Sequence, residues 1–427
     1  MPKVVVIGAG GAGCGAAIAA AKAGADTLLL ERTDMVFGAA MWAGKTAFSG
    51  IFVIHEECRA MGGREIFEAL ESIILNRANI VDEEFGYVYN CPQSEAVVRQ
   101  AVIESGVKIR FEARAVDVIK EGNSVIKKVI LADGSEIEGD VFVDATGTAG
   151  GLTNCIQYGG GACVMCPYYR CPIFGDRVGI ATKAGAKSYN VYRPDGTPGT
   201  LTAAIGIYKE SLSPELRAEL EEKGAVTIPF PPELVDYSRL ERIGAIRSRA
   251  QMENINLVDN GVAKCVGSGN FPLETLRKIR GFEKAQLAYP LGGGNKVSRV
   301  GQLDINRRED TLRIPGFKNL FGAGTKIGIG GVAEVISSGY LAGHNATRAA
   351  AGKELLELPT TVAQGDALKY LGDIWRKTDD IPKGHSFAHG PGLERLKRLG
   401  FYTGNAAEVH KKVEDAGLKD IYDQKIV

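Results

Sequence analysis

The sequence predicts an α/β fold, and its first 32 residues carry the clearest evidence for it. The apolar run from Val4 to Ile7 is typical of a buried parallel strand. An alanine-rich stretch that ends near Gly24 is typical of a helix, and a second apolar run ends at Glu31. The first strand and the helix are separated by three glycines in the spacing G-x-G-x-x-G: Gly8, Gly10 and Gly13. Together these features predict a Rossmann-like βαβ unit that binds an adenine dinucleotide.

Each part of this unit has a chemical role. Gly8 permits the tight turn, Gly10 lets a pyrophosphate approach the backbone, and Gly13 lets the helix pack closely on the strand. The helix N-terminus then offers free N–H groups and the positive end of its dipole to the phosphates. Glu31, eighteen residues past Gly13, is placed to accept a hydrogen bond from a ribose 2′-hydroxyl, and Arg32 beside it is a further candidate contact.

Length and charge restrict the class of protein. A chain of 427 residues is expected to form two or three domains. Lys and Arg total 51, as do Asp and Glu, so no overall positive charge favours nucleic acid or an anionic membrane surface. No apolar run is long enough to span a bilayer, and the chain opens directly on a strand, so we expect a cytoplasmic protein without a signal peptide. Its eight cysteines are then expected to be thiols, metal ligands or redox groups.

Periodicity and turn signals predict how the rest of the chain is organised. Helices are expected over residues 64–78 and 94–105, and three strand-like runs (107–119, 124–131 and 137–143) predict a β-meander within a mixed sheet. We expect residues 1–155 and 296–365 to form the nucleotide-binding domain. Residues 156–295 are expected to form a mixed α+β cap or substrate domain, with a helix that starts at Ser213-Pro214 and ends at Gly224. Residues 366–427 are expected to be a helical C-terminal extension.

The fingerprint occurs once and a meander follows it, a layout that resembles the glutathione-reductase-type FAD oxidoreductases. The resemblance implies that FAD is the cofactor, that Glu31 binds the adenosine ribose, and that the backbone at Ala115 and Val116 contacts adenine. It also implies that two short motifs contact the cofactor. The first motif supplies Ala145, Thr146 and Gly147, and the second supplies Gly322 and Gly324. The sequence has no second nucleotide-binding fingerprint, and it therefore does not indicate whether NAD(P)H is the reductant.

A helix rich in small residues is predicted from Val332 to Ala351, after Gly331. The resemblance implies that its N-terminus is aimed at the flavin ring, where a helix dipole stabilises negative charge by roughly 0.3–2 kcal/mol. The alternative is an ordinary helix that packs closely on the sheet through Gly339 and Gly343.

Two closer resemblances together cover somewhat over half of the chain. Residues 1–155 resemble a broad family of bacterial and archaeal FAD oxidoreductases, which share the glycine–glutamate start and the region around Thr46; Lys45 could then lie near the flavin. Residues from about 276 to 371 resemble the flavin-dependent tRNA uridine-modifying proteins, including the flavin- and folate-dependent methyltransferases. Those enzymes use an early cysteine, for which Cys58 is the rough positional candidate. We interpret Cys58 as a small buried hydrophobic residue.

A cysteine-rich stretch follows the Asp144-Ala-Thr-Gly147 motif in the spacing C-x7-C-x2-C-x4-C, with Cys155, Cys163, Cys166 and Cys171. The four thiolates could ligate an iron–sulfur cluster that exchanges electrons with the flavin, although the spacing is not a standard ferredoxin one. Cys163 and Cys166 could instead form a redox-active dithiol. A structural zinc site, or cysteines that line a pocket, is the third alternative.

The predicted function is an FAD-dependent oxidoreductase that exchanges a hydride between flavin and a small organic substrate. Cys163, Cys166 and Lys45 are the candidate catalytic residues. Two alternatives remain: an RNA-modifying flavoenzyme similar to the tRNA uridine methyltransferases, and an electron-transfer subunit that passes electrons from flavin and cluster to a partner chain. The sequence is compatible with a homo-oligomer or with a redox partner, and it favours neither a membrane nor a nucleic acid as partner.

Overall fold

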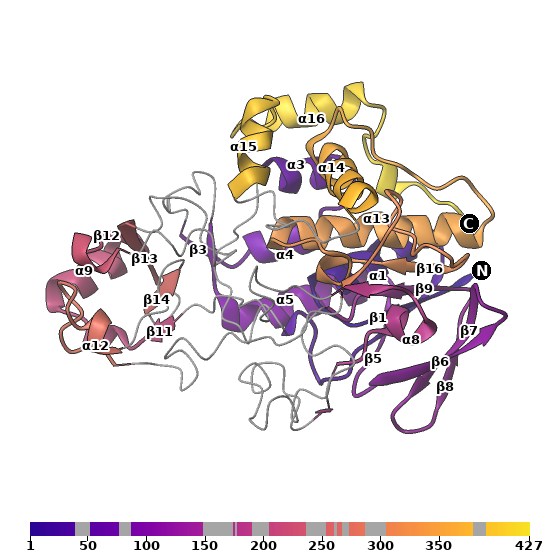
Figure 1. Ribbon diagram of the computed structural model, residues 1–427, viewed down its shortest axis with the longest axis horizontal. Helices are drawn as coiled ribbons and strands as arrows, with labels where there is room; N and C mark the ends of the chain where they lie inside the picture. The colour runs from indigo at the N-terminus through magenta and orange to yellow at the C-terminus, as the bar shows by residue number, and fades with distance from the viewer. Residues whose placement is uncertain are drawn as a thin grey trace.

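The computed structural model describes residues 1–38, 52–76, 87–147, 174–175, 177–189, 205–235, 253–259, 263–266, 273–286, 305–378 and 390–427. Its buried apolar residues form two cores. The larger core runs from Val4 to Tyr422 and includes the short helix α8 (Ile180–Ala184) and the C-terminal helices, whereas the smaller core takes residues 207–285. Figure 1 shows the smaller unit at the left end of the molecule and the larger unit on the right.

A five-stranded sheet in the order β16-β9-β1-β2-β5 forms the centre of the larger unit. All four strand pairs run parallel, and the strands are short and mostly buried, as expected for a sheet covered on both faces. The strands are β1 (Lys3–Ile7), β2 (Asp26–Leu30), β5 (Lys108–Arg110), β9 (Val141–Asp144) and β16 (Leu320–Gly322). The α/β fold class expected from the sequence is therefore confirmed.

The predicted meander exists, but its outer runs each serve two sheets. Residues 107–119 split into β5 and β6 (Ala115–Glu121), and residues 137–143 split into β8 (Glu136–Glu138) and β9. Strands β6, β7 (Val125–Leu131) and β8 form a separate antiparallel sheet, so the meander does not join one mixed sheet with the parallel strands. Gly139 permits the switch between sheets, because a Cβ there would lie 2.8 Å from a methyl group of Val5.

Two long helices pack on each other above the sheet, α1 (Gly11–Lys22) and α13 (Val332–Ala350) (Figure 1). A Cβ on Gly339 would lie 2.1 Å from the carbonyl oxygen of Ala12, and one on Gly343 would lie 1.9 Å from that of Ala16. These glycines therefore let the two helix backbones approach each other. They pack against α1, whereas the alternative considered from the sequence was that they pack against the sheet. The predicted extent of α13 is confirmed.

The remaining helices around the first half of the larger unit are α3 (Phe52–Ala60), α4 (Glu65–Glu71) and α5 (Cys91–Glu104). The helix predicted over residues 64–78 was too long, because the chain leaves α4 at Ser72 and forms β3 (Ile74–Asn76), which pairs with β4 (Val88–Tyr89). Two further short strands, β10 (Ser188–Tyr189) and β15 (Ile305–Asn306), form an antiparallel pair.

The smaller unit is an antiparallel sheet with helices. Its strand order is β11-β14-β13-β12, and α9 packs on strands β12 and β13. Ser213 accepts a hydrogen bond from the Leu216 N–H through its side chain (3.2 Å), and Gly224 closes the helix in the left-handed region, so the predicted helix boundaries are confirmed. The elements are β11 (Ile205–Ile207), α9 (Pro214–Lys223), β12 (Ala225–Pro229), β13 (Asn254–Asp259), β14 (Ala263–Val266), α12 (Leu273–Leu276) and the 3-10 turns η2 (Lys209–Ser211) and η3 (Pro232–Leu234).

The C-terminal extension packs on the larger unit. It contains α14 (Ala363–Thr378), α15 (Gly390–Arg398), α16 (Ala406–Asp415) and the turn η5 (Ile421–Asp423). Arg395 binds Asp366 through two hydrogen bonds of 2.7 Å, which joins α15 to α14. Tyr422 is fully buried and stacks on Tyr340 of α13 at 6.0 Å, and the Ile426 N–H donates to Ala23 at the end of α1. The extension is thus part of the larger hydrophobic core.

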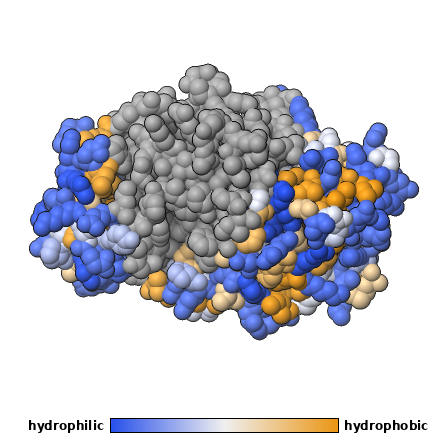
Figure 2. All heavy atoms as spheres, turned by 90° about the horizontal axis from the view of Figure 1, so that it is seen from below, coloured by the Kyte–Doolittle hydropathy of each residue, from blue (hydrophilic) through white to orange (hydrophobic). Residues whose placement is uncertain are grey.

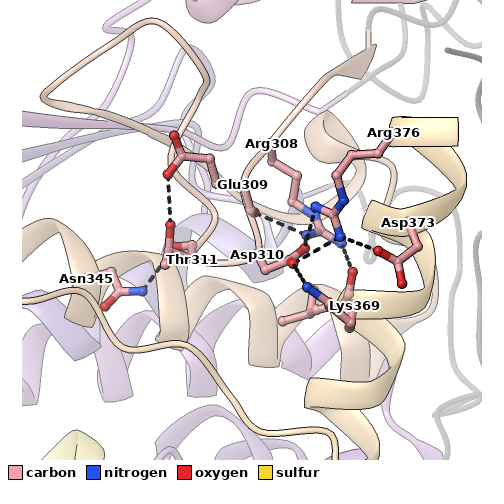
Figure 3. Close-up of polar contacts among 9 residues, drawn as sticks. Arg308, Glu309, Asp310, Thr311, Asn345, Lys369, Asp373 and Arg376 are labelled. Atoms are coloured by element: carbon pink, nitrogen blue, oxygen red, sulfur yellow. Dashed lines mark hydrogen bonds and ion pairs between the residues drawn. The ribbon is translucent and has the colours of Figure 1, made fainter.

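An ion-pair cluster joins α14 to the segment after β15 (Figure 3). Asp310 accepts from Arg308, whose side chain is fully buried, at 3.3 Å. Its carboxylate also pairs with Lys369 at 3.3 Å and Arg376 at 3.2 Å, both from α14. On the other side, Asn345 of α13 donates to the carbonyl of Thr311 at 3.0 Å. The segment is therefore held between α13 and α14.

Hydrophilic residues cover most of the described surface on the face that Figure 2 shows, and apolar residues gather on the side of the larger unit. No helix within the described ranges is long and apolar enough to cross a membrane.

Candidate functional site

Three loops meet at one edge of the parallel sheet. The register pairs Ile7 with Asp144 and Asp144 with Gly322, so β1, β9 and β16 end side by side. The loops after them start at Gly8, Ala145 and Ala323. In open α/β sheets this edge, outside the carboxyl ends of the strands, is where ligands bind. The structure therefore brings together the glycine fingerprint and both later motifs that sequence reasoning selected.

The glycine loop is closely packed on one side and open on the other. Gly8 has φ +97°, and a Cβ on it would lie 2.7 Å from the carbonyl oxygen of Ala145. A Cβ on Gly13 would lie 1.7 Å from the carbonyl oxygen of Gly8, so only glycine fits there. A Cβ on Gly10, in contrast, would meet no atom within 4 Å. The loop thus leaves open space at the one glycine that the fingerprint assigns to the pyrophosphate.

Glu31 holds this loop to the end of β2. One carboxylate oxygen accepts the Ala9 N–H at 2.8 Å, and the other accepts the Thr33 N–H at 2.9 Å and the Thr33 hydroxyl at 3.0 Å. The side chain is only partly buried, and a carboxylate offers about four lone-pair positions, two on each oxygen, so the oxygen that binds Ala9 can accept one further bond. Glu31 therefore orders the loop and keeps acceptor capacity for a ribose hydroxyl.

Asp144 has a structural role that the sequence motif did not indicate. The residue is fully buried, and one of its oxygens accepts from the N–H and the hydroxyl of Thr146, at 3.0 and 2.7 Å. The other oxygen accepts the Ala181 N–H at 2.7 Å, in the first turn of α8. Asp144 thus fixes the Ala145–Gly147 turn and ties α8 to the edge of the sheet.

The third loop leads into α13. It forms the 3-10 turn η4 (Gly324–Ile327), in which the Gly324 N–H donates to the Ser338 hydroxyl at 3.0 Å. Lys326 is fully buried in this turn. Gly331 has φ +91° and precedes α13, whose first turn has no side-chain cap. The N–H groups at the start of α13 are therefore directed toward the same edge of the sheet as those of α1.

The described residues fit an adenine dinucleotide. Among the described residues no side chain caps the N-terminus of α1, so its backbone donors are available to a ligand. The start of α13 also has no side-chain cap there, but the Glu334 carboxylate lies against it, because a Cβ on Gly331 would lie 2.0 Å from Glu334 Oε2. The open side of Gly10 leaves the room that a diphosphate needs, and Glu31 lies at the end of the neighbouring strand. Ala115 and Val116 start β6 beyond β5, with Ala115 buried and Val116 partly exposed.

Several predicted residues lie outside the described part of the chain. Lys45 and Thr46 are among them, and so are all four members of the cysteine-rich stretch: Cys155, Cys163, Cys166 and Cys171. The described cysteines are free and buried: Cys14, Cys58, Cys91 and Cys265. Burial raises the pKa of the Cys58 thiol to about 12, which agrees with the interpretation of Cys58 as a buried hydrophobic residue. Within the described ranges no His, Cys, Asp and Glu side chains group as a metal site would require.

Comparison with known proteins identifies the type of cofactor domain. Residues 3–152 match the family model described as FAD dependent oxidoreductase. The N-terminal part of the chain is therefore similar to the FAD-dependent oxidoreductases. Residues 270–354 match a second family, Glucose inhibited division protein A. FAD is thus the dinucleotide that the family match supports, and the predicted resemblance to flavin-dependent tRNA-modifying proteins is confirmed for the late part of the chain.

The relatives that match do so over only part of this chain. A methylenetetrahydrofolate–tRNA-(uracil-5-)-methyltransferase of Lactobacillus delbrueckii subsp. bulgaricus is 39% identical over 102 residues, which is 24% of this chain and 22% of that protein. An FAD-dependent monooxygenase of Nectria sp, ntnJ, is 27% identical over 154 residues, 34% of this chain and 36% of its own. Each alignment thus covers well under half of the relative.

One solved structure covers nearly the whole fold. The GidA protein of Aquifex aeolicus, in its form II crystal, superposes with a TM-score of 0.64 over 97% of this chain and 76% of its own, at 17% identity. At this identity the likeness concerns the fold. It includes the region between the two matched segments, for which neither family model gives a match.

Proposed function

We propose that this protein is an FAD-dependent oxidoreductase that exchanges a hydride between the flavin and a small organic substrate. The observation that carries the proposal is the open glycine loop at the carboxyl ends of β1, β9 and β16, followed by the uncapped N-terminus of α1. The family match over residues 3–152 supports the same cofactor. Equal numbers of acidic and basic residues, 51 of each, favour a small substrate over a polyanion.

Bound FAD would supply the two-electron chemistry, and the chain would bind and orient it. Gly10 would leave room for the diphosphate, and Glu31 would accept a hydrogen bond from the adenosine ribose while it continues to hold Ala9. The N-terminus of α13 at Gly331 and Val332 would direct its N–H groups and dipole toward the flavin ring, where they favour negative charge.

The first test is the cofactor content of the purified full-length protein. We expect flavin absorption bands and close to one FAD per chain, and bleaching of the bands when a substrate or a reductant such as NADH or NADPH is added without oxygen. Protein that holds no flavin and takes up no added FAD would overturn the proposal.

A tRNA uridine-modifying flavoenzyme is the second candidate function. The 97% coverage by the GidA fold and the match over residues 270–354 favour it. Such an enzyme must bind tRNA through phosphate contacts, so its affinity should fall steeply as salt is raised. A filter-binding titration with bulk tRNA at two salt concentrations distinguishes the candidates, because a small-molecule oxidoreductase should show no saturable, salt-dependent binding.

The cysteine-rich stretch and Lys45 belong to this proposal as its catalytic part. A relay of electrons from the flavin through Cys163 and Cys166 is one hypothesis, and an iron–sulfur or zinc site with Cys155 and Cys171 is another. Measuring iron and zinc in anaerobically purified protein separates the metal hypotheses from the dithiol. Unchanged turnover in a Cys163→Ser, Cys166→Ser double variant would rule out the relay.

A further inference from the structure

A segment outside both matched regions lies against the cofactor edge of the sheet. It leads into α8, and its residues 174, 175 and 177 are described. The carbonyl oxygen of Gly175 accepts a hydrogen bond of 2.7 Å from Arg32, just after β2. A Cβ on Gly175 would lie 2.7 Å from the Nε of Arg114, so a second arginine lies against the same glycine. The segment is thus fixed on the side of the sheet where Glu31 follows β2.

Two residues later the segment reaches the other loops of the site. A Cβ on Gly147 would lie 2.6 Å from Nη1 of Arg177 and 3.7 Å from the hydroxyl oxygen of Thr325. The guanidinium of the half-buried Arg177 therefore lies beside Gly147 in the loop after β9, and Thr325 of the turn η4 lies near the same glycine. The bond from the Ala181 N–H to Asp144 anchors the chain four residues further on. Arg177 is thus held from both directions at this position.

This position is close to the glycine loop. A Cβ on Gly8 would lie 2.7 Å from the carbonyl oxygen of Ala145 and 3.1 Å from the Cα of Thr146. The loop after β9 therefore lies against Gly8 through Ala145 and Thr146, and against the Arg177 guanidinium through Gly147. The start of α1 offers partial positive charge from its N–H groups, equivalent to about half an elementary charge. A diphosphate carries more negative charge than this dipole can balance.

We propose that Arg177 binds the diphosphate of FAD as a side-chain ligand additional to the backbone of the glycine loop. The proposal rests on the FAD site of the proposed function. A guanidinium brings a full charge and a planar fork of donors that matches phosphate oxygens. Arg177 lies in a part of the chain that neither family model covers, so neither match by itself implies this contact.

The test compares Arg177→Gln and Arg177→Lys with a control from the same segment, Lys183→Gln, which removes an exposed positive charge from α8. Apoprotein of each full-length variant is titrated with FAD, followed by flavin fluorescence, and with ADP, followed by calorimetry. Because charge-assisted hydrogen bonds contribute about 1.5–3 kcal/mol, Arg177→Gln should weaken both ligands about 10- to 100-fold. Arg177→Lys should lose less, and Lys183→Gln should stay within about twofold of wild type.

The outcomes separate the two proposals. Wild-type apoprotein that binds no FAD overturns the proposed function. Wild type that binds FAD, together with an Arg177→Gln variant of equal affinity, overturns the role of Arg177 alone. Weaker FAD binding with unchanged ADP binding also overturns it, because the guanidinium would then contact the flavin end. If Arg177→Gln loses its circular dichroism signal, the same ADP and FAD titrations of Arg177→Lys decide the question.

Discussion

Glu57 offers a quantitative test of how the C-terminal extension is attached. This carboxylate of α3 is fully buried, and its two oxygens accept the N–H groups of Ala363 at 2.5 Å and Gln364 at 2.8 Å, where α14 begins. Burial raises the pKa of Glu57 from its ordinary value of 4.5 to about 7, although the two N–H donors and the charge of Lys412 oppose the increase. The folded protein therefore binds the Glu57 proton more tightly than the unfolded chain does.

The sign and size of the effect follow from this difference. Because the pKa of Glu57 is raised in the folded state, the contribution of Glu57 to the stability of the folded protein is complete below pH 4.5 and is lost as the pH rises to about 7. A tenfold change in an ionisation constant is worth about 1.4 kcal/mol, so the change from 4.5 to about 7 corresponds to about 3 kcal/mol. Glu57→Gln removes the charge, but it keeps only one acceptor oxygen for the two N–H groups. It should therefore be less stable than wild type near pH 4.5, and its stability relative to wild type should rise by up to about 3 kcal/mol by pH 8.

The assay is thermal and urea unfolding of wild type and Glu57→Gln from pH 4.5 to 8.5. The matched control is Glu68→Gln, which makes the same chemical change at an exposed position of α4. We expect the stability of Glu57→Gln relative to wild type to rise with pH and to level off above pH 7, and the control to show no such trend. A stability of Glu57→Gln relative to wild type that stays constant or falls as the pH rises would refute the argument.

Three further predictions concern the glycine loop, the ion-pair cluster and the smaller unit. Gly10→Ala should leave the melting temperature of the apoprotein unchanged but weaken FAD binding at least about tenfold, as measured by a fluorescence titration. Gly13→Ala should instead cost about 1–3 kcal/mol of stability by overpacking, as measured by a melting curve. Asp310→Asn should cost about 3 kcal/mol of stability, because it leaves the buried guanidinium of Arg308 without its carboxylate. The control Asp373→Asn, at the edge of the cluster, should cost less than about 1 kcal/mol. Equal losses for the two variants in urea unfolding would contradict the buried role of Asp310. Ser213→Ala should cost about 1 kcal/mol through the lost helix cap, measured as faster amide exchange in α9, and unchanged exchange would argue against it.

Sequence patterns predicted the local units because their determinants are close together in the chain. The glycine spacing, the acid at the end of the second strand, the Ser213 cap and the extent of α13 all depend on neighbouring residues, and the structure has each of them. The patterns failed where one apolar run is divided between two sheets, as in residues 107–119 and 137–143. An apolar run indicates a strand, but it does not indicate which partner the strand will pair with.

Tertiary structure alone decided the contacts between distant segments. Glu57 and Ala363 are 306 positions apart, and nothing in the local sequence marks either residue as part of a helix cap. The Arg177 guanidinium reaches Gly147 because Arg32 holds Gly175 on one side of it and Asp144 holds Ala181 on the other. The sequence by itself therefore determined the dinucleotide fingerprint and the α/β class, since both follow from short-range spacing and periodicity. The folded chain decided which charges lie near the fingerprint and how the C-terminal helices pack on α3, since these depend on packing across the whole core.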